Sequence, residues 1–431
     1  GPWLKGGQVD ASDRSAVCAP LAALLYRAEA LPALADVLNE PKRGFGYSVS
    51  HAPDASEGWV ELLASGLTFD LHGLKDGPSA PASPIATTIG LSQPDIGEMR
   101  WLTLAPGPHL AGAGGLLPVI RVAAMLLIEL AEMSQAEGIS WIPAHLVLKP
   151  GLFGQAVLPW LEGGPFPAPA FVAMHRLDDG SMASRGLNLL MGQEFILQPG
   201  KSEDASLLAR TAVRLVDWLV AHGPVLQPTR AILAGTGAVS LEAQFGVLSL
   251  RGATETEQSQ PERACLPFGS VNVPGQAGYC PDQQRHHLVP RQVLSFPAFR
   301  KMIDTLGHDR LGVHDFRRNG QLLPGSEHAA LRAGLPLHRG PHRAYNELVI
   351  ERIGQIEADW SQARRKGSVT ADFTALMRFD LLQRALRRRF LDPRNWSRLP
   401  LNTRDPSLDF SHLDDMAELF WTDTAAVQRA N

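Results

Sequence analysis

The chain has 431 residues, 45% of them hydrophobic and 19% charged, and its 40 Lys and Arg against 44 Asp and Glu give a formal net charge of −4. This length predicts two or three domains rather than one ordinary core, and the composition is that of a globular protein. Three cysteines are too few for a disulfide framework, and the longest apolar run, 116–130, is interrupted by Arg121 and Glu129, so we expect no membrane-spanning segment.

Charge is unevenly distributed along the chain. Residues 1–280 carry 17 Lys and Arg against 26 Asp and Glu, whereas residues 281–431 carry 23 against 18. An acidic N-terminal part and a mildly basic C-terminal part fit a phosphate-binding unit joined to a domain of another kind. The alternative is chance variation in the charge of a solvated surface. The first residues lack the basic start and apolar stretch of a secretory signal. We therefore expect any export to use a machine that does not read such a signal, unless the signal lies outside this sequence.

Regularly patterned segments follow one another through the first 250 residues. Segments with helical apolar spacing, or rich in Ala and Leu, predict helices at 19–38, 116–135 and 207–222. Short apolar segments predict strands within 59–74, 99–104, 141–148, 170–176, 187–197 and 231–250. The mixture predicts an α+β fold class, with an N-terminal mixed α+β domain over residues 1–250.

A change in composition marks the predicted domain boundary. Residues 251–284 begin polar and charged and then become rich in Pro, Gly and Asn, as is typical of a linker. Cys265 and Cys280 lie in this stretch, either as free thiols or as a pair across a loop. The second domain is predicted to run over residues 285–431.

Helical patterning continues in the second domain. Residues 296–311 are predicted to be helical, and a closing helix is indicated by apolar residues at helical spacing between Leu376 and Phe390. Four arginines accompany that closing helix, at 384 and 387–389. They predict a solvated helix face, with a DNA-binding clamp as the alternative.

Four histidines form the most informative pattern of the second domain. His286 and His287 are adjacent in R-H-H-L-V-P-R-Q, and His338 and His342 follow in L-H-R-G-P-H-R-A-Y-N. Neighbouring residues of a strand face opposite sides, so His286 can ligate a metal ion while His287 faces a substrate as a general base. We expect His286, His338 and His342 to hold one divalent cation. Pro341 places His342 in the first turn of a helix that runs to about Ile356.

The segment between the two histidine pairs completes a recognisable layout. Asn319 and Gly320 open N-G-Q-L-L-P, a signal for a tight turn before a second strand. Asn319 in this place is expected either to form that turn or to bond the backbone of the loop that carries His287. A strand, a second strand and a helix with the last ligand constitute a ββα-metal arrangement.

These strings together resemble the AHH family of the HNH/endonuclease VII superfamily over residues 285–356. Arg285 stands where that family usually has Ala before the histidine pair. The resemblance implies a C-terminal ββα-metal nuclease domain with extra helices, of the kind found in bacterial polymorphic toxins. It implies His287 and Asn319 as catalytic residues and a metal held by His286, His338 and His342.

The function expected from this resemblance is metal-dependent cleavage of DNA by an antibacterial toxin or effector. Three imidazoles favour Zn²⁺ or Ni²⁺, while Mg²⁺ or Mn²⁺ can serve in turnover. We expect DNA and a cognate immunity protein as partners, the latter either separate or fused as residues 1–250. The producing cell is expected to hold the protein in its cytoplasm and to deliver it into target cells through a specialised secretion system.

Two other functions remain open at this point. The four histidines would also suit a non-catalytic interaction protein with a structural zinc site, which would lose its fold on chelation. RNA cleavage on the same scaffold is the second alternative. Residues 1–250 show no catalytic pattern, and their six histidines are scattered. A delivery domain, a partner-recognition domain and an immunity-like inhibitor are the three roles considered for them.

Overall fold

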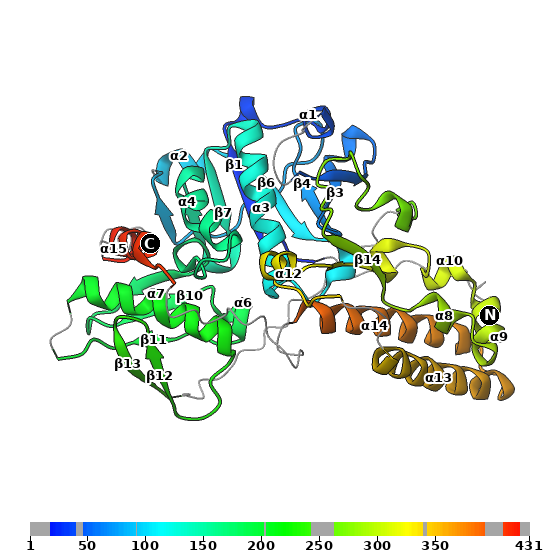
Figure 1. Cartoon of the computed structure of the whole chain (residues 1–431). Helices are drawn as coiled ribbons and strands as arrows, with labels where there is room; N and C mark the ends of the chain where they lie inside the picture. The colour runs from blue at the N-terminus through cyan, green and yellow to red at the C-terminus, as the bar shows by residue number, and fades with distance from the viewer. Residues whose placement is uncertain are drawn as a thin grey trace, which may run out of the picture.

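An eight-stranded sheet forms the centre of the N-terminal part of the molecule (Figure 1). The computed structural model describes residues 18–39, 46–91, 93–201, 204–242, 263–338, 343–392 and 408–422. The order across the sheet is β2-β3-β4-β6-β1-β7-β8-β5, with only the β5–β8 pair parallel. The strands are β1 Ala22–Tyr26, β2 Ser48–His51, β3 Trp59–Ala64, β4 Leu67–His72, β5 Thr87–Ile89, β6 Arg100–Pro106, β7 Gly138–Trp141 and β8 Leu146–Leu148.

Strand β1 shows why this sheet lies inside the protein. It pairs with β6 on one side and β7 on the other, and all five of its residues are buried. Its side chains alternate between two cores, with Leu24 in the larger one and Leu25 in a smaller one on the other face. A strand covered on both faces needs apolar residues at every position. The helix predicted over 19–38 is therefore wrong, because its first half is this two-sided strand.

Helices and small sheets surround the main sheet. The long helix α3 contacts β1, β4 and β6, and α4 contacts α3. The helices of this part are α1 Leu34–Asn39, α2 Gln93–Gly97, α3 Leu117–Ser134, α4 Pro150–Leu161, α5 Ala168–Phe171, α6 Asn188–Met191 and α7 Ala205–His222. The remaining strands are β9 Ala173–Arg176, β10 Met182–Arg185, β11 Ile196–Leu197, β12 Thr229–Leu233 and β13 Gly237–Leu241. The predictions at 116–135 and 207–222 are thus confirmed as helices.

Three predicted strands are only partly correct. Residues 141–148 contain the end of β7 and all of β8, separated by a 3-10 turn, and residues 170–176 begin in helix α5 before β9. Residues 187–197 contain helix α6 before the short β11. Short apolar segments of this kind have no period that separates a buried strand from a buried helical turn.

The histidine-bearing part has its own core (Figure 1). Strands β14 and β15 pair, and the long helices α13 and α14 lie side by side below them. The elements are β14 Gln283–His287, α8 Arg291–Leu294, α9 Pro297–Leu306, α10 His308–Leu311, α11 Phe316–Asn319, β15 Gly320–Pro324, α12 Glu327–Ala333, α13 Arg343–Arg365 and α14 Ala371–Leu391. The α+β class, the helix near 296–311 and the closing helix agree with the sequence-based predictions.

Two segments cross the predicted domain boundaries. Residues 243–250, the end of a segment predicted as strands, and residues 251–262, most of the first half of the predicted linker, lie outside the described residues. The linker from 263 onward packs on β14 and α11 through Phe268. The last helix, α15 Ser411–Trp421, packs against α7 and adds Phe420 to the front core. We therefore call residues 18–242 together with α15 the front unit, and residues 263–391 the back unit. The division at 1–250, 251–284 and 285–431 itself stays a prediction.

The three cysteines and the helices bear on two further expectations. Cys265 and Cys280 are free thiols, so the alternative pairing between them is not formed. Within the described ranges, no helix is both long enough and apolar enough to cross a bilayer.

Candidate functional site

The pairing of β14 with β15 sets the position of the histidine pair. His286 lies opposite Gln321 and His287 opposite Gly320 in this antiparallel ladder. The two imidazoles have different surroundings, as expected of neighbours on a strand. The His286 ring lies 5.7 Å from that of Tyr345, between centroids, whereas the His287 ring stacks on a different element, the 3-10 turn that contains Phe268.

His338 is brought next to His286. Their ring centroids are 5.2 Å apart, and the His338 backbone amide donates to the Pro324 carbonyl at the end of β15. Nδ1 of His338 lies 3.1 Å from Oε1 of Gln284. Because a carboxamide oxygen accepts, Nδ1 donates, and the lone pair of the ring is left on Nε2, the nitrogen suited to a metal.

His342, the third predicted ligand, lies outside the described residues, and helix α13 begins at the next residue. Among the described residues, no group of three or more His, Cys, Asp or Glu side chains could hold a metal ion. The two described imidazoles do fit such an ion chemically, because nitrogen donors suit Zn²⁺ and Ni²⁺ and Gln284 orients one of them from behind. The structure thus brings together His286 and His338 of the predicted set.

Asn319 is fully buried and holds the loop that follows His287. Its Oδ1 accepts from the Val289 amide at 2.8 Å, and its Nδ2 donates to the carbonyls of Val289 at 3.2 Å and Val313 at 3.0 Å. Its own carbonyl accepts from the Leu288 amide at 2.8 Å. These contacts match the backbone-bonding position considered for this side chain, while its catalytic role stays a prediction.

The tight turn predicted at Asn319 and Gly320 is wrong. Asn319 ends helix α11 and Gly320 begins β15 with an extended backbone, φ −111° and ψ 151°. The segment from α8 to α11 is inserted between the two strands, so no hairpin turn joins them. Glycine is still required by close approach, because a Cβ at position 320 would lie 2.2 Å from the Phe316 ring.

His287 is held as a neutral imidazole. Its centroid lies 3.8 Å from that of Phe268, with the planes only 6° apart. Burial, together with the positive charge of Arg291 and the nearby His314, lowers the pKa of His287 to about 4. The ring is therefore neutral at pH 7 and can accept a proton, but a pKa of about 4 makes it a weaker base than an ordinary imidazole.

Tyr345 and Arg387 both donate hydrogen bonds to backbone carbonyls. The Tyr345 hydroxyl donates to the Leu288 carbonyl at 2.5 Å, and its ring lies 5.2 Å from that of Phe390, between centroids. Arg387 is 2% exposed and donates to backbone carbonyls of three other residues. The four arginines therefore do not form one solvated face, and helical spacing from Phe390 and Gln383 was the signal that places Arg387 inward.

Comparison with known proteins adds one finding. Residues 269–385 match the model of AHH, described as a nuclease family of the HNH/ENDO VII superfamily with conserved AHH. The match starts at Gly269, 16 residues before the region 285–356 that shows the resemblance in sequence. It includes the described histidines of the site and most of α14. No curated protein and no solved structure matches the chain.

Proposed function

We propose that this protein cleaves DNA with one divalent cation and acts as an antibacterial toxin or effector, because residues 269–385 match the AHH nuclease family of the HNH/ENDO VII superfamily. The observation that carries the proposal is the convergence of His286 and His338, at 5.2 Å between ring centroids, with His287 as the next residue of the same strand. Nucleases of this superfamily are generally metal-dependent. A structural zinc site alone would not require the fourth histidine.

The proposed mechanism divides the work among a few side chains. His286, His338 and His342 would hold the cation, which, when bound, stabilises negative charge on the phosphate and on the leaving oxygen. His287 would accept the proton of the attacking water, since its ring is neutral at pH 7. Asn319 would keep the loop after His287 in place through its bonds to Val289.

The biological setting belongs to the same proposal. A toxin that cuts DNA endangers the cell that makes it, so we expect a cognate immunity protein, either separate or fused as residues 1–250. We further propose that the protein stays in the cytoplasm of its producer and is delivered by a specialised secretion system. The acidic balance of residues 1–280, 26 acids against 17 bases, is the argument for the fused form, in which the front unit would inhibit the nuclease rather than complete its site.

One assay of the full chain tests the activity. The purified protein is incubated with supercoiled plasmid and with structured RNA, with EDTA, and then with added Zn²⁺, Ni²⁺, Mg²⁺ or Mn²⁺. We expect nicked and linear DNA, loss of cleavage with EDTA, and recovery with at least one metal. Cleavage of RNA alone would favour the ribonuclease alternative. Tight metal binding, no cleavage and unfolding on chelation would favour the structural zinc site.

A further inference from the structure

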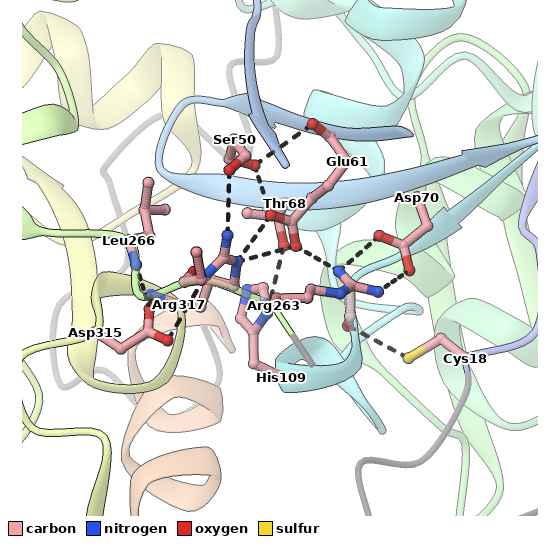
Figure 2. A network of polar contacts seen from close by, with 12 residues as sticks. Cys18, Ser50, Glu61, Thr68, Asp70, His109, Arg263, Leu266, Asp315 and Arg317 are labelled. Carbon is pink, nitrogen blue, oxygen red and sulfur yellow. Dashed lines mark hydrogen bonds and ion pairs between the residues drawn. The ribbon is translucent and has the colours of Figure 1, made fainter. Parts of the chain in front are cut away.

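Four buried charges join the front unit to the back unit (Figure 2). Glu61 on β3 and Asp70 on β4 lie directly opposite each other in the front sheet and are 0% and 3% exposed. Arg263 and Arg317 of the back unit lie against them, their side chains 9% and 6% exposed. Charges this deeply buried must be paired, because desolvation of a lone one is very costly.

Glu61 is the centre of this group. Nε of Arg317 donates to its two oxygens at 2.8 and 3.0 Å, and Arg263 also bonds it while holding both oxygens of Asp70 at 2.7 and 2.9 Å. The Ser50 hydroxyl donates to Glu61 as well, at 2.6 Å. Although burial opposes ionisation, Arg317 and Arg263 hold the pKa of Glu61 below its usual value. Figure 2 shows the two guanidinium groups approaching this carboxylate from either side.

Arg317 connects this group to the candidate nuclease site. It lies on α11, two residues before Asn319, the side chain that holds Val289 in the loop after His287. The Arg317 carbonyl accepts from Arg387 at 2.6 Å, and Arg387 also donates to the Gly320 carbonyl at 2.9 Å. Helix α11 is thus held at its side chain by the front sheet and at its backbone by α14.

The front unit takes part in the second contact too. Arg387 donates to the carbonyl of His109, a front-unit residue, at 3.3 Å. Leu63, two residues after Glu61 on β3, belongs to a buried cluster with Phe268 and Phe316. Phe268 is the ring on which His287 stacks. The front unit therefore contacts both α11 and the residue that packs on the proposed base.

We propose that the front unit completes the nuclease site, with Glu61 as a positioning residue that acts through Arg317. By fixing α11, Glu61 fixes Asn319 and so the backbone of Leu288 and Val289 next to His287. This inference rests on the nuclease function proposed above. A buried ion pair usually adds little net stability compared with apolar residues of the same size, so geometric specification is the role that suits this one, and a direct test of coupling is required.

The test uses the full chain and two readouts. Glu61→Gln removes the charge with little change of shape. We expect kcat for a defined DNA duplex to fall at least about tenfold, since small misplacement of a reacting group is costly, while KM changes less than about twofold. Hydrogen exchange of the Leu288 and Val289 amides, which Asn319 protects, should become faster.

A matched control separates positioning from stability. Asp414→Asn breaks an ion pair within the front unit, between Asp414 of α15 and Arg214 of α7. The side chains of these two residues are each 12% exposed. We expect this variant to lose stability while kcat and the two amide exchange rates stay as in the wild type. The double variant Glu61→Leu with Arg317→Met replaces the ion pair by an apolar pair. It should be more thermally stable than Glu61→Gln, but its kcat should stay as low.

The outcomes that overturn the inference are distinct. Unchanged exchange of both amides in Glu61→Gln would overturn it, whether or not the wild type cleaves nucleic acid. Equal losses of kcat in Glu61→Gln and Asp414→Asn would reduce the effect to stability and also overturn it. A rise in cleavage on Glu61→Gln would do so as well and would favour the fused inhibitor. A wild-type protein inactive on DNA and RNA with every metal would instead contradict the proposed function.

Discussion

His286 and His287 are adjacent in sequence, but their side chains contact different residues. The first lies against His338, Tyr345 and Phe390, and the second stacks on Phe268 near Arg291. The alternation of side chains along β14 causes this separation. A one-residue shift in the pairing of β14 with β15 would exchange the two environments, so register is as important to the proposed chemistry as residue type.

The two roles should separate on substitution. His287→Ala is expected to lower kcat at least about 100-fold, within the range for loss of a general base, with metal affinity changed less than threefold. His338→Ala should lose both metal binding and cleavage. Calorimetric titration with Zn²⁺ and a plasmid-nicking assay measure the two quantities. His328→Ala, an exposed histidine of α12, is the control, and full activity of His287→Ala would end its assignment as the base.

Asn319 makes a structural prediction that is independent of catalysis. Asn319→Ala leaves the Val289 amide and two buried carbonyls without their partner, so we expect the free energy of unfolding to fall by about 2–4 kcal/mol, measured by urea denaturation. Activity should fall with it. Asn272→Ala removes a carboxamide that also makes three backbone bonds, to Cys280 and to Gln283, the first residue of β14. It should reduce stability with less than a threefold change in kcat.

At the scale of elements, the insertion α8–α11 determines how the two strands meet. In a direct hairpin, Asn319 and Gly320 would form the turn itself. Here four short helices precede β15, and Asn319 instead ends one of them. From the end of this helix the carboxamide bonds Val289 in the loop after His287. The same insertion brings the Phe316 ring over Gly320.

Gly320→Ala tests that close approach. The added methyl would lie 2.2 Å from the Phe316 ring, so ring or strand must move, at an expected cost of about 1–3 kcal/mol. Thermal unfolding gives the change directly. Gly269→Ala is the control, because a Cβ there meets nothing within 4 Å and its φ is not in the left-handed region. Equal melting temperatures for both variants would contradict the role given to Phe316.

At the scale of the whole molecule, the two units share a boundary of buried charge and apolar contact. The acidic residues of the front sheet pair with arginines of the back unit, and Leu63 packs against Phe268. The chain then returns, since α15 packs on α7 at the far side of the front unit. Docking of this kind makes independent motion of the two units costly.

Asp70 gives this boundary a dependence on pH. Burial, aided by Glu61 and opposed by Arg263, raises the pKa of Asp70 to about 6. The folded state thus holds this proton more tightly than the unfolded chain does, so the contribution of Asp70 to stability decreases as pH rises from about 4 to about 6 and is constant above. The Asp70→Asn variant lacks this titratable carboxyl group.

The stability of the Asp70→Asn variant relative to the wild type should accordingly increase between pH 4 and pH 6. We expect the difference in free energy of unfolding, variant minus wild type, to rise by about 2–3 kcal/mol between pH 4 and pH 6, as two pKa units imply. Urea denaturation at four pH values between 4 and 7.5 measures it. A difference that is flat across the range, or that falls, would show that Arg263 outweighs burial at Asp70.

Several elements were predictable from local pattern. The adjacent histidines lie on a strand, the residues after Asn319 form the strand that pairs with it, and periodicity alone places α3, α7 and α14. The run at 19–38 was not predictable in this way, because Ala and Leu favour helices when alone and two-sided strands when buried. The inward position of Arg387 could have been inferred from helical spacing, but its partners could not, because they are carbonyls of residues far away in sequence.

The sequence by itself determined the residue types on which the proposed chemistry of the back unit depends, their order, and the opposite orientation of His286 and His287 that strand geometry enforces. Only the tertiary structure decided that Glu61, more than 250 residues before Arg317, lies against the helix that leads to Asn319. Local pattern arises from interactions between near neighbours along the chain, whereas charge pairing across two units depends on how complete sheets and helices dock.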